Sequence, residues 1–214
     1  MKRTGGGERT PLEAVVLAAG SSRRFGGGKL TAPFQGGVLL DGALAAAFAA
    51  PVRAVTVVTG ADGPAVEAAA RAFAARSGNL DRLRIAHAPD HAEGLAASIR
   101  AGIASLPLDA DGAFVFLGDM PRVPHAVLAP LAGLIAAGHV AAAPVFTGRR
   151  GHPAVFARAL FPDLAALGGD QGARALLDRV APPLVEAPDD GVLFDVDTRE
   201  DLEQNKPGSP LSRG

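Results

Sequence analysis

The loop from Ala19 to Lys29 contains the residues best suited to chemistry. It holds four glycines, two serines, two arginines and one lysine. Glycine allows positive φ and close approach of backbone N–H groups to an anion, serine hydroxyls add donors, and cations balance charge. This composition favours phosphate binding, although an ordinary surface turn has the same composition. The loop directly follows a short apolar run at 14–18, and this favours a ligand because ligands of open α/β sheets gather where strands end.

Two common phosphate motifs do not describe this loop. A Walker motif would need glycine at Arg23 and a hydroxyl residue at Leu30. A dinucleotide fingerprint beginning at Gly20 would need glycine where Ser22 stands. The loop therefore belongs to neither class.

Acidic residues follow two other apolar segments. Asp119 comes directly after the run at 113–117, and Asp195 and Asp197 precede a short acidic helix expected at 199–203. Each carboxylate could simply form a turn or cap a helix. The functional alternative is that Asp119 and Asp197 share one Mg²⁺, which would explain how two mutually repelling carboxylates lie close together.

Alternating apolar segments predict the elements that hold these residues. Helical periods with apolar stripes fall between the predicted strands, and nearly continuous apolar runs indicate a sheet covered on both faces. We expect an α/β sandwich with ligands at the carboxyl edge of its sheet. The apolar segment 126–146 is interrupted by proline and glycine, so we predict a core helix and a buried strand there rather than a membrane span. The predicted strands are 13–18, 53–59, 83–87, 113–118, 140–146, 153–156 and 192–195.

Length and charge restrict the class of protein. The 214 residues predict one domain over 11–205, with tails at 1–10 and 206–214. The net charge of −1 gives no global attraction to nucleic acid or to an anionic membrane. The chain has no cysteine, which excludes disulfides and thiolate metal sites and fits a reducing compartment. We find no export signal, and we expect a cytoplasmic protein.

Five motifs in series resemble one family. Residues 17–29 match the signature L-A-A-G-x-S-x-R-x-G-x-x-K of the molybdenum cofactor nucleotidyltransferases of the MobA-like family at every fixed position. Together the motifs cover 13–203 in the family's order. The other four are Gly118-Asp119-Met120-Pro121, Arg150-Gly151-His152-Pro153, Gly169-Asp170-Gln171-Gly172-Ala173-Arg174 and Asp195-Val196-Asp197-Thr198.

The resemblance implies a fold and an activity. The fold would be a three-layer α/β/α sandwich of the nucleotide-diphospho-sugar transferase type, mainly parallel, with one antiparallel strand near 153–156. The activity would be transfer of CMP from CTP to the terminal phosphate of Mo-molybdopterin, with release of pyrophosphate. Leu-Ala-Ala-Gly at 17–20 is similar to CTP-using members, whereas GTP-using relatives tend to have glycine in place of Ala19. Mg²⁺ would be the cofactor, with Mn²⁺ as a substitute. The product would pass to a molybdenum hydroxylase-type apoenzyme or its chaperone.

The resemblance also implies roles for residues of this chain. Lys29 and Arg24 would bind phosphates, and together with Asp119 they form the catalytic group. Asp119 and Asp197 would hold the metal. Two assignments keep a structural alternative, since Ser98 could lie on a polar helix face and His152 could be a buried structural histidine. The nucleotide residues would be Leu17, Ala18, Ala19, Gly20, Ser22, Gly26, Gly94 and Ser98, and the acceptor residues would be Arg150, His152 and Arg174.

Two other functions remain open from the sequence. The same fold and loop serve cytidylyl- or guanylyltransferases that act on other phosphorylated small molecules. A non-catalytic chaperone that delivers finished cofactor is the alternative from another class. Lys29, Asp119 and Asp197 favour an enzyme, because a pure carrier needs no metal-triphosphate machinery.

Overall fold

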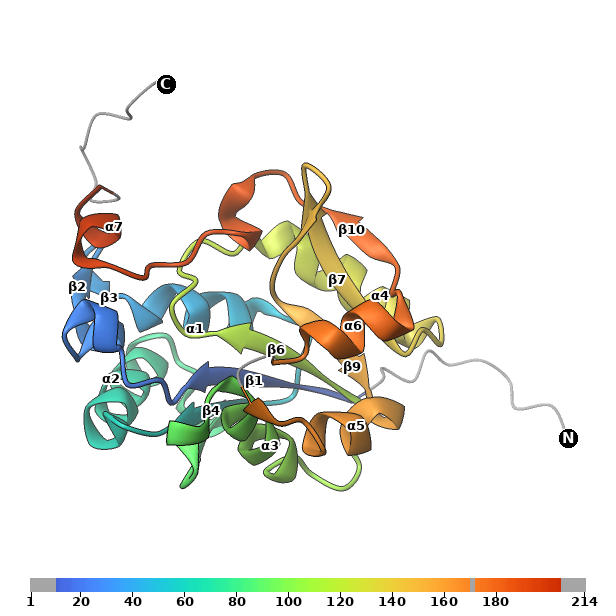
Figure 1. The fold of residues 1–214 in the computed structure, drawn as a ribbon, viewed down its shortest axis with the longest axis horizontal. Helices are drawn as coiled ribbons and strands as arrows, with labels where there is room; N and C mark the ends of the chain where they lie inside the picture. The colour runs from blue at the N-terminus through green and yellow to red at the C-terminus, as the bar shows by residue number, and fades with distance from the viewer. Residues whose placement is uncertain (1–10, 170–171, 205–214) are drawn as a thin grey trace, which may run out of the picture.

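The computed structural model describes residues 11–169 and 172–204 and has one central mixed sheet (Figure 1). Both predicted tails, as well as Asp170 and Gln171 of the fourth motif, lie outside these residues. The strand order is β10-β7-β9-β6-β1-β4-β5, and β8 pairs with β7. The strands are β1 (Leu12–Ala18), β4 (Val55–Thr59), β5 (Leu83–His87), β6 (Gly112–Leu117), β7 (Ala141–Phe146), β8 (Arg149–Arg150), β9 (Ala154–Ala157) and β10 (Leu184–Glu186), with a separate hairpin of β2 (Pro33–Phe34) and β3 (Gly37–Val38).

Helices cover both faces of this sheet. Side chains alternate along β1, so that Ala14 and Val16 pack with α1, α2 and α4, whereas Val15 and Leu17 pack with α3, α5 and α6. The result is the predicted three-layer α/β/α sandwich. The helices are α1 (Leu40–Ala49), α2 (Gly63–Arg76), α3 (Leu95–Ala104), α4 (Leu128–Ala136), α5 (Phe161–Ala165), α6 (Arg174–Val180) and α7 (Arg199–Gln204).

The sheet is mainly parallel, and β9 runs against its neighbours. β1 is parallel to β4 and β6, whereas β9 is antiparallel to β6 and β7. This confirms the antiparallel strand predicted near 153–156. The segment 126–146 forms α4 and β7, as predicted. Within the described residues, no helix is both long enough and apolar enough to span a bilayer.

The prediction of a last strand at 192–195 is wrong. A 3-10 turn occupies Asp190–Val192. The strand at this edge of the sheet is β10, which lies earlier in the chain than predicted. Val192 is fully buried, and its carbonyl accepts a hydrogen bond from the His152 N–H at 2.8 Å. Val192 belongs to the hydrophobic core, and Leu193 and Phe194 pack against it, so the apolar pattern here reflects burial rather than strand pairing.

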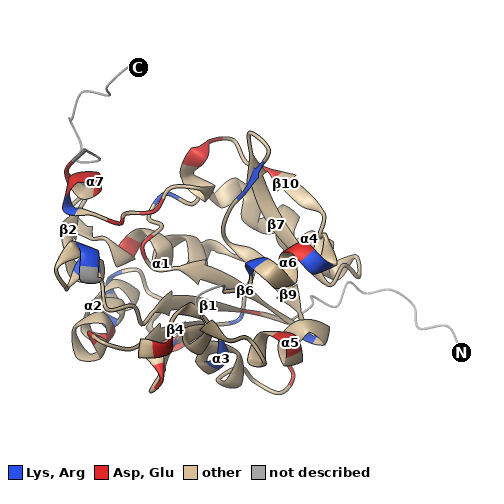
Figure 2. Cartoon of the chain, in the orientation of Figure 1, with Lys and Arg blue, Asp and Glu red and all other residues tan. Residues whose placement is uncertain are grey.

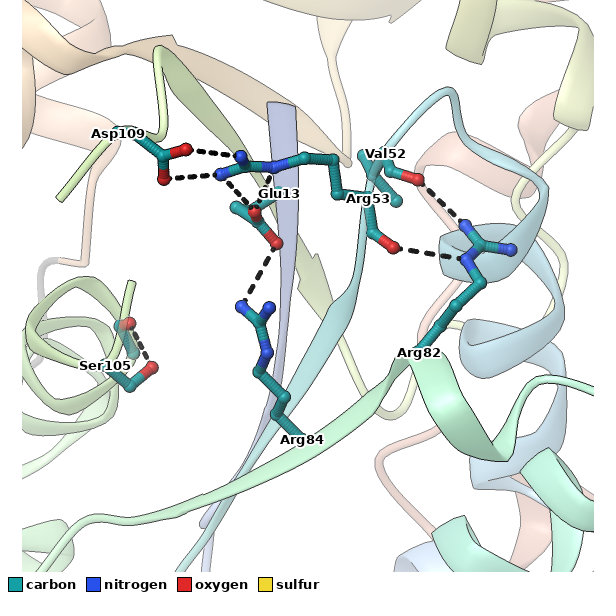
Figure 3. A network of polar contacts seen from close by, with 8 residues as sticks. Glu13, Val52, Arg53, Arg82, Arg84, Ser105 and Asp109 are labelled. Atoms are coloured by element: carbon teal, nitrogen blue, oxygen red, sulfur yellow. Dashed lines mark hydrogen bonds and ion pairs between the residues drawn. The ribbon is translucent and has the colours of Figure 1, made fainter. Parts of the chain in front are cut away.

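A network of charged residues surrounds the buried Glu13 at the amino ends of the central strands (Figure 3). The Glu13 side chain on β1 is fully buried and contacts Arg53 at 2.7 Å and Arg84 at 3.5 Å. Arg53 also binds the exposed Asp109. This network joins β1 to β5 and to the start of β4 at the end opposite the glycine-rich loop.

Candidate functional site

The glycine-rich loop after β1 curls around one carbonyl group. The Ser22 carbonyl accepts hydrogen bonds from the N–H groups of Phe25, Gly26 and Gly27 at 3.0, 3.1 and 3.1 Å. Gly26, Gly27 and Gly28 have φ values of 88°, 90° and 63°, a region that favours glycine. The glycines therefore make the tight curl possible.

This curl limits which N–H groups can hold an anion. Gly26 donates to the loop itself, and Gly28 donates to Asp62 Oδ2 at 3.2 Å. Within the described part of the chain, the N–H groups of 20–22 have no acceptor. The N–H groups of 20–22 are therefore open to a ligand, whereas the N–H of Gly26 shapes the loop.

Four charged side chains from three distant parts of the sequence meet at the loop. Lys29 Nζ lies 2.7 Å from Asp119 Oδ2 and 3.6 Å from Asp197 Oδ1. Arg24 binds the other oxygen of Asp197 at 2.8 Å. Lys29 is only 9% exposed, whereas Arg24 extends into solvent. Figure 2 shows the basic loop and the acidic segment at the same end of the molecule.

The acidic segment 194–204, here called the strap, is hydrogen-bonded to the loop that follows β6. The Val196 N–H donates to the Asp119 carbonyl at 3.1 Å. Thr198 caps α7, since its hydroxyl accepts from the Asp201 N–H, and Asp201 Oδ2 accepts in return from the Thr198 N–H. These hydrogen bonds lower the pKa of Asp201. The cap thus leaves the Asp197 carboxylate facing Lys29 and Arg24.

Arg199 joins the strap to the glycine-rich loop. Its Nε donates to the Phe25 carbonyl at 3.2 Å, and its guanidinium lies 4.9 Å from the centre of the Phe25 ring. Phe25 is only 3% exposed, so packing holds its ring in place for this contact. The conformation of the loop and the position of Asp197 therefore depend on the same segment.

The charges around Lys29 fit an added cation. Burial, together with the negative charges of Asp119 and Asp197, raises the pKa of Asp195. Two cations, Lys29 and Arg24, face three carboxylates, so negative charge is in excess. Among the described residues no group of three or more His, Cys, Asp or Glu could enclose a metal. Mg²⁺ needs no such cage, because it commonly takes one or two carboxylates and completes its shell with water and phosphate oxygens.

A cavity of about 570 Å³ opens beside these charges. Every predicted nucleotide-binding and catalytic residue except Gly26 lines this cavity. The sequence analysis did not predict His91, which lines this cavity from the turn before α3. The lining residues are Leu17, Ala18, Ala19, Gly20, Ser21, Ser22, Arg24, Phe25, Lys29, Leu30, His91, Ala92, Gly94, Leu95, Ser98, Leu117, Asp119 and Asp197.

A second cavity, of about 510 Å³, contains all three predicted acceptor residues. It shares Leu17, Leu95 and Leu117 with the first, so the two cavities are neighbours across the ends of β1 and β6. Its lining combines apolar side chains of the sheet and helices with three arginines and one aspartate. The remaining lining residues are Ile99, Val115, Gly148, Arg149, Arg150, Gly151, His152, Ala154, Phe156, Gly172, Ala173, Arg174, Leu177 and Asp178.

Contacts within the second cavity hold Arg150 toward α6. Its guanidinium binds Asp178 Oδ1 at 2.6 Å and lies 3.4 Å from the Arg174 carbonyl. Burial lowers the pKa of His152, and its buried Nδ1 has no partner among the described residues. Asp178 is a second residue that sequence reasoning missed, because its role depends on a contact between segments 28 residues apart.

Comparison with known proteins identifies the family of this chain. A MobA-like NTP transferase domain matches residues 14–184, which is most of the chain. The chain belongs to this family. The resemblance inferred from the five motifs is thereby confirmed at the level of the family.

Three curated relatives cover nearly the whole chain. The purine catabolism protein PucB of Bacillus subtilis is 32% identical over 91% of this chain and 96% of its own length. The nicotine blue oxidoreductase of Paenarthrobacter nicotinovorans is 31% identical, covering 89% and 94%. The molybdenum cofactor cytidylyltransferase of Escherichia coli is 26% identical, covering 89% and 93%. The family is therefore shared by proteins with different named activities.

A solved structure of a related protein has the same fold. The Mycobacterium tuberculosis protein Rv0371c in complex with manganese is 28% identical, with a TM-score of 0.71 and coverage of 92% of this chain and 98% of its own.

Proposed function

We propose that this protein transfers CMP from CTP to the terminal phosphate of Mo-molybdopterin and releases pyrophosphate. The observation that carries the proposal is the meeting of Lys29, Asp119 and Asp197 at a cavity that shares a wall with a second, basic cavity. A transferase needs such a pair of neighbouring sites. The Escherichia coli cytidylyltransferase among the relatives supports this choice of substrates.

The proposed reaction is a displacement at the α-phosphorus of CTP. An oxygen of the acceptor phosphate forms the new bond, and the bond to the β-phosphate bridging oxygen breaks, so that its electron pair leaves with pyrophosphate. Lys29 and Arg24 offset charge on the triphosphate, while the N–H groups of 20–22 donate to its oxygens. The acceptor phosphate is already ionised, so no general base is required.

Asp119 and Asp197 would hold Mg²⁺, with Mn²⁺ as a substitute. Carboxylate oxygens suit either ion, and the manganese complex of the mycobacterial relative supports a divalent cation in this family. When bound, the ion would supply positive charge that stabilises the phosphate oxygens. Asp197 would keep its orientation through Arg24 and the capped start of α7.

Arg150, His152 and Arg174 would bind the acceptor. Two guanidinium groups suit its phosphate, and the apolar side chains of the second cavity suit a ring system. The dinucleotide product would pass to a molybdenum hydroxylase-type apoenzyme or its chaperone. A cytoplasmic location remains a prediction.

A pyrophosphate assay tests the proposal. The purified protein is incubated with Mg²⁺, Mo-molybdopterin and each nucleoside triphosphate in turn, while pyrophosphate and the dinucleotide product are measured. We expect release with CTP that depends on the acceptor. Lys29→Met is the matched inactive control, and Arg71→Met changes an exposed cation of α2 that is paired with Glu67.

The alternatives give different results in the same assay. A cofactor-delivery chaperone binds the finished cofactor and releases no pyrophosphate. A transferase for another phosphorylated small molecule releases pyrophosphate only when that acceptor replaces Mo-molybdopterin. Either result would overturn the proposed reaction.

A further inference from the structure

Two glycines outside the cavities pack against the loop that carries Asp119. Gly42 lies in α1, Gly191 lies in the 3-10 turn before the strap, and neither lines either cavity. Neither glycine has a positive φ, so other residues could adopt its backbone conformation. Within a helix, alanine is also favoured over glycine. Glycine at these positions therefore points to a lack of space rather than to a turn.

The contact at Gly191 joins two backbones. A Cβ atom on Gly191 would lie 2.0 Å from the Arg122 carbonyl oxygen, whereas Cβ atoms essentially never come closer than 3.0 Å to such a neighbour. The Arg122 side chain adds to the contact, since it pairs with Asp190 at 3.3 Å and lies 4.7 Å from the centre of the Phe194 ring. In Figure 1 the chain between β10 and α7 accordingly runs beside the loop that leaves β6.

Both sides of this contact are packed against other elements. On the loop side, a Cβ atom on Gly42 would lie 2.2 Å from the Pro121 carbonyl oxygen, and Met120 is buried in the core. On the other side, Val192 is fully buried, and its carbonyl accepts from the His152 N–H. An added side chain between the loop and the turn therefore has no free space and must displace one of them.

The loop and the turn lead to the two carboxylates that contact Lys29. Asp119 lies in the loop, and Asp197 lies in the strap that continues from the turn. The Val196 N–H donates to the Asp119 carbonyl at 3.1 Å, so loop and strap are also hydrogen-bonded next to these acids. A Cβ atom on Gly191 requires a separation of at least about 1 Å, which exceeds the tolerance of about 0.5 Å for groups that hold a metal.

We propose that Gly42 and Gly191 are positioning residues that set the separation of the Asp119 and Asp197 carboxylates, and thereby the affinity of the site for a divalent cation. The inference rests on the proposed function in taking these two acids as the metal ligands. Neither glycine touches the ion, and each acts through the backbone of the loop. Alanine at either position moves Asp119 relative to Asp197, so that one ion no longer reaches both.

Manganese binding tests this inference apart from catalysis. The dissociation constant of Mn²⁺ is measured by electron paramagnetic resonance with saturating CTP and without acceptor, for the wild type, Gly42→Ala and Gly191→Ala. Gly133→Ala is the matched control, because Gly133 is an exposed glycine of α4 with open space where its Cβ atom would stand. Asp119→Asn reports whether the measured ion occupies this site. Calorimetry of CTP in EDTA and thermal melts follow nucleotide binding and folding separately.

We expect Gly42→Ala and Gly191→Ala to weaken Mn²⁺ binding about 10- to 100-fold, as is typical when a residue that orients metal ligands is changed. Asp119→Asn should weaken it at least as much. Gly133→Ala should stay within about twofold of the wild type. The two glycine variants should bind CTP without metal within about threefold of the wild type, whereas a variant that is only destabilised would bind both ligands less well.

Unchanged Mn²⁺ affinity in either folded glycine variant would overturn the positioning role of that glycine. Mn²⁺ binding that Asp119→Asn does not affect would overturn the role of both. If acceptor-dependent pyrophosphate release persists in these cases, the transfer reaction stands and only the positioning role is lost. If the glycine variants lose Mn²⁺ but the wild type releases no pyrophosphate with any acceptor, the transfer reaction is wrong and the positioning role stands.

Discussion

Lys29 is a buried cation whose position depends on two carboxylates. Its ammonium lies within 4 Å of both Asp119 and Asp197, which come from segments far apart in the sequence. Burying a lysine is costly unless it is paired, so this arrangement is kept by its opposite charges. Under the proposed function, we expect the same ammonium to contact the oxygens of a bound triphosphate.

Replacing Lys29 tests this role. Lys29→Met should lower kcat/KM for pyrophosphate release by about 10²- to 10⁴-fold, because a preorganised charge facing the transferred group is lost. Steady-state kinetics measure the loss, and a thermal melt separates it from unfolding. Activity within about threefold of wild type in a folded variant would remove Lys29 from the mechanism.

Asp197 is a side chain whose role the local sequence left open between two interpretations. Asp197 could have been a helix cap or a metal ligand on sequence grounds. In the structure Thr198 and Asp201 form the cap, and Asp197 contacts Arg24 and Lys29. The cap is a local contact between residues three apart, whereas the partners of the Asp197 carboxylate come from residues more than 150 positions away.

Among the secondary-structure elements, the strap has the clearest influence on the site. It carries Asp197, is hydrogen-bonded to the backbone of Asp119, and contacts Phe25 through Arg199. The strap and the glycine-rich loop therefore support each other. This arrangement predicts that a residue outside the cavity affects nucleotide binding.

Arg199→Ala should raise KM for CTP about 10-fold and leave kcat within about threefold. The lost contacts are one charged hydrogen bond and one cation–π contact, and a tenfold change corresponds to a loss of about 1.4 kcal/mol of their stabilisation from nucleotide binding. Steady-state kinetics at saturating acceptor measure both constants. Arg199→Lys should recover part of the affinity, and Arg71→Ala on α2 should change neither constant. A fall in kcat alone would contradict a role in positioning the loop.

Elements differ in how well their sequence predicts them. Continuous apolar runs correctly indicated β1, β6 and β7, because strands buried on both faces need such runs. The edge strand β10 was missed, since its three residues are largely exposed and follow two prolines. At a sheet edge, pairing on one side is enough, and the apolar signal is weak.

In the assembled domain, the site and the buried network around Glu13 lie at opposite ends of the sheet. Arg53 and Arg84 are partly exposed, so water can solvate them if Glu13 is removed. The network should therefore contribute to stability without affecting the reaction.

Glu13→Ala should lower the free energy of unfolding by about 2–3 kcal/mol, from the lost ion pairs and the space left in the sheet. Denaturant titration measures this change. Asp109→Ala is the matched control, because Asp109 is mostly exposed and should cost less than about 1 kcal/mol. Both variants should keep the kcat of the wild type, and a large loss of kcat in a stable Glu13→Ala protein would contradict the separation.

The fold class, the central strands, the family and the residue types of the site could be inferred from the chain as written. These properties depend on local periodicity and on short motifs, which are contiguous in sequence. Folding determined which carboxylates meet Lys29, which arginine binds Asp197, and that His91 and Asp178 line the two cavities. Each of these depends on contacts between segments brought together by the sheet, and such contacts leave no periodic trace along the chain.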